Sequence, residues 1–263
     1  MAILGKLSPT TAETDTLLYR VPANRRAVLN LAASNRSGAL ARIRVALVAA
    51  DDLIVDSVTV TNPGSGYTTI PTLTLTPPAG NTPTTAATLS VASMQVASVS
   101  LLSAGAGYLV GDILEIQGGT ASTRARVRVE AIGAGGTITT LSLFEVGTYT
   151  GLPSGTLSLN GGTGSGATLT ASFGIRAISV GNKGQGYTGT PTLSAPGGTG
   201  FAATLNLSQA IEGNDYLEFD ASLDIADVLE RTGLALSAGD GLFVRSNTAN
   251  SVNFFAIGFE EVA

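Results

Sequence analysis

The sequence predicts an all-β protein in which both chain ends form a small antiparallel β-sandwich, jelly-roll-like in kind, and the middle forms an inserted four-repeat β domain. Three observations predict this. Apolar residues alternate with Thr and Ser in many short segments, the pattern of strands with one buried face. A glycine-tyrosine motif returns four times in the middle of the chain. The two terminal segments hold most of the Arg, Asp and Glu and lack that motif.

The terminal segments, residues 1–55 and 211–263, are predicted to form one discontinuous base domain. Their alternating segments, separated by turn sequences such as Pro22-Ala-Asn24 and Ser237-Ala-Gly239, give about seven strands, enough for a small sandwich. A domain can be inserted where a hairpin loop is exposed and its ends lie close together. We therefore expect residues 56–210 to replace one hairpin turn of the base domain.

The repeated motif reads GSGYT, GAGY, GTYT and GQGYT, and its tyrosines are spaced by 41, 41 and 38 residues. A fixed period of this length indicates stacked supersecondary units. Each unit has an alternating strand, the motif, a second strand often opened by Pro-Thr, a Gly/Thr loop and a third strand. We expect the repeats at about 57–96, 97–136, 137–176 and 177–210.

The motif has a structural interpretation and a functional one. Glycines permit a positive φ in a tight turn, and we assign this role to Gly64, Gly66, Gly105, Gly107, Gly184 and Gly186. The tyrosine would then fold its ring over neighbouring backbone and keep its hydroxyl in water. The alternative is that exposed rings stack on carbohydrate, and the candidates are Tyr67, Tyr108 and Tyr187.

Composition argues against several classes of function. The formal net charge is −5 and only 13% of residues are charged, so no basic field would attract nucleic acid. No apolar run reaches the length of a membrane span, and the first residues lack a signal-peptide pattern. We expect a protein that is made in a host cytoplasm, binds no nucleic acid and does not insert into a membrane.

The chain has no histidine and no cysteine. Their absence removes the Ser-His-Asp triad, the cysteine nucleophile and the histidine zinc site. A glycosidase would need two facing carboxylates, and the repeats offer few, among them Asp112 and Glu115, which we expect to be solvated. Residues 184–189 fit G-x-G-x-x-G, but Thr190-Pro191 follows where a dinucleotide site needs a helix. We predict no enzyme, no catalytic residue, no metal and no cofactor.

Arg124, Arg126 and Arg128 alternate along one predicted strand, which places three guanidinium groups on one face. Such a stripe is usually a solvated strand face. It could also contact anionic groups, either acidic residues of a neighbouring subunit or a surface polysaccharide, because arginine forms forked bonds to carboxylates.

Four segments of the base domain carry a resemblance to a known class. They are residues 17–23, LLYRVPA; residues 30–36, NLAASNR; residues 229–240, LERTGLALSAGD; and residues 244–249, VRSNTA. Together they resemble a small β-sandwich module of virion structural proteins in tailed bacteriophages, including cyanophages. The GSGYT-type repeats resemble arrays in phage tail and other surface proteins.

The resemblance implies a non-enzymatic virion protein at the particle surface, which docks by its sandwich and projects the repeats outward. The repeats favour a place on a tail fibre or baseplate, and the alternative is a decoration or cement protein on the capsid. A further alternative is a glycan-binding module for host attachment. The implied partners are other virion proteins, copies of the same chain, with a trimer as the first expectation, and host surface polysaccharide.

Overall fold

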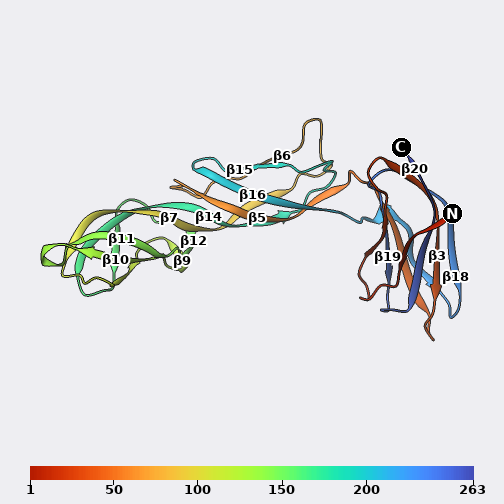
Figure 1. Cartoon of the computed structure of the whole chain (residues 1–263), viewed down its shortest axis with the longest axis horizontal. Helices are drawn as coiled ribbons and strands as arrows, with labels where there is room; N and C mark the ends of the chain where they lie inside the picture. Colours follow the sequence, from red (N-terminus) through yellow and green to blue (C-terminus); the bar gives the residue numbers. More distant parts are fainter. The chain divides into compact units, whose positions relative to one another are not determined.

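The structure, a computed structural model, describes residues 1–263 and is built from β-strands with two short 3-10 helices. It confirms the predicted all-β class. The chain divides into two compact units (Figure 1). The base unit comprises Met1–Ile54, Gln185–Gly189 and Ser208–Ala263, and the inserted unit comprises Val55–Gly184 and Thr190–Leu207. The segment Gln185–Gly189, which the sequence pattern assigns to the repeats, thus belongs to the base unit.

The base unit is an eight-stranded sandwich of two antiparallel sheets. One sheet has the order β1-β20-β3-β18 and the other β17-β4-β19-β2. This order is that of a jelly roll, in which two Greek keys fold over each other. The strands are β1 (Ala2–Leu7), β2 (Thr16–Arg20), β3 (Arg25–Asn35), β4 (Ala41–Val48), β17 (Tyr216–Leu223), β18 (Val228–Leu236), β19 (Gly241–Ser246) and β20 (Val252–Val262).

The sequence pattern predicts seven of these strands, at residues 16–21, 26–35, 41–49, 216–219, 228–236, 242–246 and 252–259, and misses β1. Its alternation is broken at Gly5, where the pairing with β20 shifts register between Ile3 and Gly5. A bulge of this kind puts an extra residue into the strand and hides the period of two. The strand nevertheless completes the sheet and adds Leu4 and Leu7 to the edge of the core.

The core of the base unit follows from the alternation of the strands. Strand β3 turns Leu29 and Leu31 inward, and β4 turns Ile43 and Val45 inward from the facing sheet. Burying each such side chain stabilises the fold by about 1.5–3 kcal/mol relative to leaving it exposed. The core side chains therefore hold the two sheets together face to face.

The insertion replaces the connection between β4 and β17. The two chain segments that bound it are held together within the base unit by Gln209, whose Nε2 donates to the carbonyl oxygens of Val48 at 3.2 Å and Ala49 at 2.7 Å. The Ala210 N–H also donates to the Asp52 carbonyl at 3.4 Å. These bonds meet the geometric requirement for an insertion, which is that its ends lie side by side.

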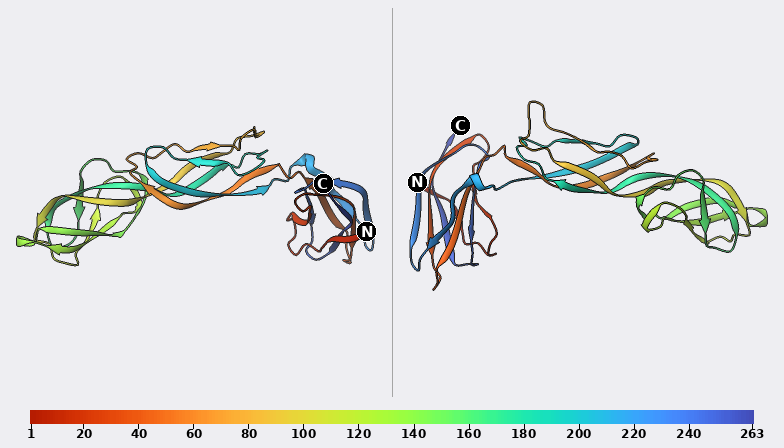
Figure 2. Two further views of the ribbon diagram at one scale, coloured as in Figure 1. Left: turned by 45° about the horizontal axis from the view of Figure 1, so that its top comes forward. Right: turned by 180° about the vertical axis from the view of Figure 1, so that it is seen from behind.

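The inserted unit contains one eight-stranded sheet, of order β11-β10-β8-β13-β14-β7-β12-β9, and the strand pairs β15-β6 and β16-β5. Its longest strands, β7 and β14, run antiparallel along their whole lengths and lie side by side (Figures 1 and 2). The elements are β5 (Leu53–Ser65), β6 (Thr74–Thr76), β7 (Thr88–Ala106), β8 (Ile113–Ile116), β9 (Thr120–Thr123), β10 (Arg126–Ile132), β11 (Ile138–Glu145), β12 (Thr148–Gly151), β13 (Leu157–Asn160), β14 (Ser165–Asn182), β15 (Thr192–Ser194) and β16 (Thr199–Gln209).

The repeats do not stack in sequence order. They pair in a nested way, the first with the fourth and the second with the third. Short strands β6 and β15, which follow the first and fourth motifs, pair with each other around Leu75 and Leu193. Strands β7 and β14 each serve two repeats, because each is the last strand of one and the first of the next.

Candidate functional site

The four motif tyrosines mark the nested pairing residue by residue. The backbone of Tyr67 bridges to Phe173, which lies 14 positions before Tyr187, and Tyr187 bridges to Leu53, which lies 14 positions before Tyr67. Tyr149 in turn pairs with Met94, 14 positions before Tyr108. Three motifs therefore dock on the first strand of the partner repeat, whereas the Tyr108 N–H of the second motif donates to the carbonyl oxygen of Gly136, in the short 3-10 helix Ala134–Gly136.

The tyrosine rings are buried, with 0–2% of each residue exposed. The Tyr149 hydroxyl accepts the Ala125 N–H at 3.0 Å, and the Tyr108 hydroxyl accepts the Ala167 N–H at 3.3 Å. Two expectations need correction. The hydroxyls of Tyr67, Tyr108 and Tyr149 bond to backbone of the partner repeat instead of water, and the buried rings of Tyr67, Tyr108 and Tyr187 have no free face on which a sugar could stack. Burial also raises the pKa of Tyr67 and of Tyr149.

The motif glycines permit this close docking. At Gly105, φ is +57° and an added Cβ would lie 2.4 Å from the Ser165 carbonyl oxygen, so any side chain would collide with the partner repeat. At Gly64, φ is +68° and a Cβ would lie 2.8 Å from the Thr199 carbonyl oxygen. All six predicted turn positions have positive φ, namely Gly64, Gly66, Gly105, Gly107, Gly184 and Gly186.

Asp112 has a structural role that the sequence pattern did not reveal. One carboxylate oxygen accepts the N–H of Leu109 at 3.0 Å and both the N–H and the hydroxyl of Thr163, at 3.0 and 2.8 Å. The backbone bond from Leu109, followed by that from Thr163, lowers the pKa of Asp112. The side chain stays at the surface and also ties the loop after the second motif to the Gly/Thr loop of the third repeat.

The arginine stripe lies on the outer face of the inserted unit and is largely neutralised by the chain itself. On β10, Val127 and Val129 point inward and Arg126 and Arg128 outward. The Arg126 guanidinium lies 3.8 Å from the Glu145 carboxylate. Arg124, just before β10, lies 3.6 Å from the Glu115 carboxylate. Two of the three guanidinium groups therefore have intrachain partners, in exposed ion pairs worth at most about 1 kcal/mol each.

Two open grooves lie in the inserted unit. One, of about 380 Å³, is lined by the glycines of the second Gly/Thr loop and by the segment after the third motif, including Gln117, Pro153 and Ser154. The other, of about 490 Å³, lies between β15 and β16 and is lined by Pro191, Leu193 and their neighbours. No group of three or more His, Cys, Asp or Glu residues is placed to hold a metal, and no helix is long and apolar enough to cross a membrane.

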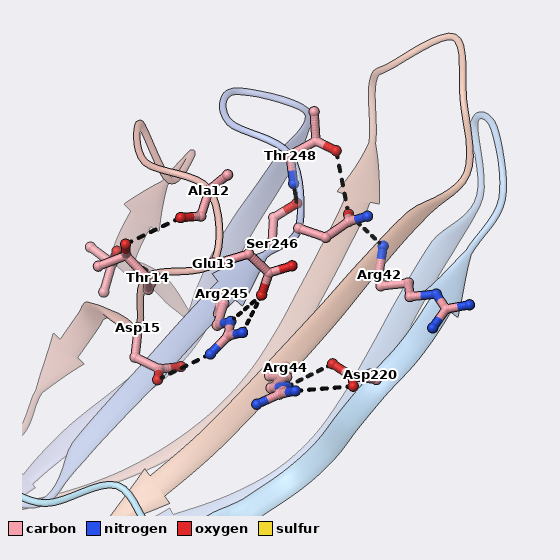
Figure 3. A network of polar contacts seen from close by, with 12 residues as sticks. Ala12, Glu13, Thr14, Asp15, Arg42, Arg44, Asp220, Arg245, Ser246 and Thr248 are labelled. Carbon is pink, nitrogen blue, oxygen red and sulfur yellow. Dashed lines mark hydrogen bonds and ion pairs between the residues drawn. The ribbon is translucent and has the colours of Figure 1, made fainter.

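The two outer faces of the base unit differ in character. On the β17-β4-β19-β2 sheet, Arg44 and Arg245 form ion pairs at the surface (Figure 3). Arg44 holds Asp220 through two bonds of 2.6 and 3.0 Å, which lowers the pKa of that carboxyl, and its guanidinium stacks 3.9 Å from the Phe219 ring centre. Arg245 pairs with Glu13. Arg44 and Arg245 on this face are thus paired within the chain.

The outer face of the β1-β20-β3-β18 sheet carries a band of apolar side chains, interrupted by Asn30 and bordered by Lys6, Glu230 and the ion pair of Arg26 with Glu261. Alternation along β20 turns Phe254 and Ala256 into the core and leaves the residues between them pointing outward. Side chains from all four strands contribute to this surface, which we call the apolar face; its members are Ile3, Val28, Ala32, Ala235, Phe255, Ile257 and Phe259. A contiguous apolar surface on a folded domain marks a site of contact with another molecule.

No protein-family model, curated protein sequence or solved structure matches this chain. The features that bear on function are therefore the jelly roll, its insertion and the two outer faces of the base unit.

Proposed function

We propose that this chain is a non-enzymatic structural protein of a tailed-phage virion, which docks through its base unit and presents the inserted unit at the particle surface. The observation that carries the proposal is the jelly-roll strand order of the base unit, interrupted in one connection by a complete β unit. Double-sheet jelly rolls are the architecture of many viral capsid domains. Fold alone does not fix function, and the outer faces of the base unit provide further support.

The surfaces support a docking role for the base unit. One outer face carries a band of apolar side chains that suits contact with another protein, while the other carries ion pairs of Arg44 and Arg245 that can remain in water. The inserted unit has a Gly- and Thr-rich surface and buried motif tyrosines, which suit a rigid projecting element. Among virion locations we favour the tail fibre or baseplate, on the resemblance of the repeats to tail-protein arrays.

Gold-labelled antibody on intact particles of the encoding phage, viewed by electron microscopy, tests the proposal. Label on the tail or baseplate is the expected result. Label over the head would instead assign the protein as a capsid decoration or cement protein. Particles that carry no label, prepared beside a lysate in which the same antibody detects the chain, would refute a virion role.

A further inference from the structure

We propose that the apolar face of the base unit binds a second copy of this chain, in a two-fold dimer with the two faces packed together. The proposal goes beyond the virion role, because it concerns the purified chain and holds or fails independently of where the protein resides. It rests on the arrangement of large, small and charged side chains across the face.

The strand register places these side chains in rows across the sheet. Phe255 on β20 lies beside Ala32 on β3, and the same row ends with Lys6 on edge strand β1 and Glu230 on edge strand β18. Two residues further along β20, Ile257 lies beside Ile3 and Asn30, and Phe259 then lies beside Val28. The outward residues of β20 in these rows are therefore bulky, and those of β3, Ala32, Asn30 and Val28, are smaller, with one polar residue among them.

We place a two-fold axis between two such faces, parallel to the strands. This axis reverses the strand order of the second sheet, so each strand on one side of the first sheet lies opposite a strand from the other side of the second. Strand β20 then faces the partner's β3, so Phe255 meets the partner's Ala32 and Phe259 meets the partner's Val28. A bulky column over a small one lets the side chains interdigitate, as in aligned packing of two sheets. The order β1-β20-β3-β18 is thus self-complementary in shape.

The same axis brings the two edges into charge complementarity. Strand β1 faces the partner's β18, so Lys6 meets the partner's Glu230, and the contact occurs twice. Neither residue has an ion pair within its own chain, although other exposed charges of this unit, such as Arg26 with Glu261, are paired. Lys6 instead lies 5.5 Å from the Phe255 ring centre, at the margin of the apolar face.

The face is also of suitable size. Four strands about 4.8 Å apart, with about eight residues rising about 3.4 Å each, give about 500 Å² in projection. The side chains protrude from the sheet, so the accessible area of the face is larger than its projected area. This brings the accessible area towards the value of a standard interface, about 800 Å² per partner. A face packed on itself requires two-fold symmetry, so this geometry predicts a dimer in place of the trimer expected from the sequence.

The test is the mass of the purified full-length chain in solution, by light scattering on size-exclusion chromatography at micromolar concentration. The expected mass is twice the 26.4 kDa of one chain. Because each substitution occurs twice in the interface, Phe259→Asp should weaken dimerisation by about a hundredfold or more. The matched control is Phe144→Asp, at an exposed phenylalanine of β11 in the inserted unit, which should leave the dimer intact.

A charge exchange tests the specific two-fold arrangement. Lys6→Glu should weaken the dimer by about tenfold, because two carboxylate pairs then face each other. Adding Glu230→Lys in the same chain should restore wild-type association. Circular dichroism confirms that each variant is folded. A monomeric wild-type chain, a trimer, or a Lys6→Glu defect that Glu230→Lys leaves unrepaired would overturn the proposal.

Discussion

Removing the buried hydroxyl of Tyr149, by the substitution Tyr149→Phe, should destabilise the inserted unit. The residue is 0% exposed, and its hydroxyl accepts the Ala125 N–H at 3.0 Å. Its ring packs edge-on against Phe173, with 5.4 Å between ring centres and 76° between planes. Tyr149→Phe keeps the ring and this packing and removes only the acceptor for the Ala125 N–H.

The expected loss follows from the unpaired donor. A buried N–H that loses its partner costs about 1–3 kcal/mol, so we expect the free energy of unfolding to fall by about 2 kcal/mol. For a unit of this size such a loss lowers Tm by about 4–8 °C. Tyr149→Ala also removes the ring and should cost about 3–5 kcal/mol.

Differential scanning calorimetry and urea unfolding followed by circular dichroism measure both variants. Tyr216→Phe in the base unit is the control, because its hydroxyl lies only partly buried and 3.4 Å from the Asp15 carboxylate. We expect it to change stability by less than about 0.5 kcal/mol. If Tyr149→Phe proved as stable as the wild type, the hydroxyl would not be an internal partner of the neighbouring repeat, and the docking role of the motif would be refuted.

Two further predictions concern the same unit. Gly105→Ala should lower Tm more than Gly80→Ala in calorimetry. Both glycines have positive φ, but only at Gly105 would the added Cβ contact backbone atoms. Equal losses of Tm would show that the backbone conformation alone sets the cost. The lowered pKa of Asp112 means that its stabilising contribution is complete above the ordinary carboxyl pKa of 3.8 and is lost as pH falls through the lower folded-state value. Asp112→Asn should therefore reduce stability at pH 7 and flatten this acid dependence in urea titrations, and an unchanged pH profile would contradict the assignment.

The sequence predicts the class of fold because the class depends on local patterns. Alternation in β3 and β4 marks the inward residues of the sandwich, and the structure confirms an all-β fold with a jelly-roll base. Strand β1 escapes prediction because Gly5 and its bulge interrupt the alternation. A period of two can be read only where the register is regular.

The arrangement of the motif residues could not be predicted, because it depends on partners distant in sequence. The spacing of the tyrosines shows that Tyr108 and Tyr149 are equivalent, but it does not show that each hydroxyl reaches the backbone of the other's repeat. Glu115 and Glu145 likewise reach the arginine stripe from neighbouring strands. Side chains on different strands become neighbours only once the pairing order is known.

Nested pairing of the repeats explains how a repeat domain can occupy a loop of a jelly roll. Stacking in sequence order would leave the first and fourth repeats at opposite ends, and the two chain ends would lie far apart. Pairing the first repeat with the fourth instead makes β5 and β16 neighbours in one sheet. The inserted unit therefore begins and ends on adjacent strands. Its two ends thus lie close enough together to replace a connection between β4 and β17, which are neighbours in the base unit. The same nesting makes the two motifs of each pair depend on each other, which is why a single buried hydroxyl should affect the whole unit.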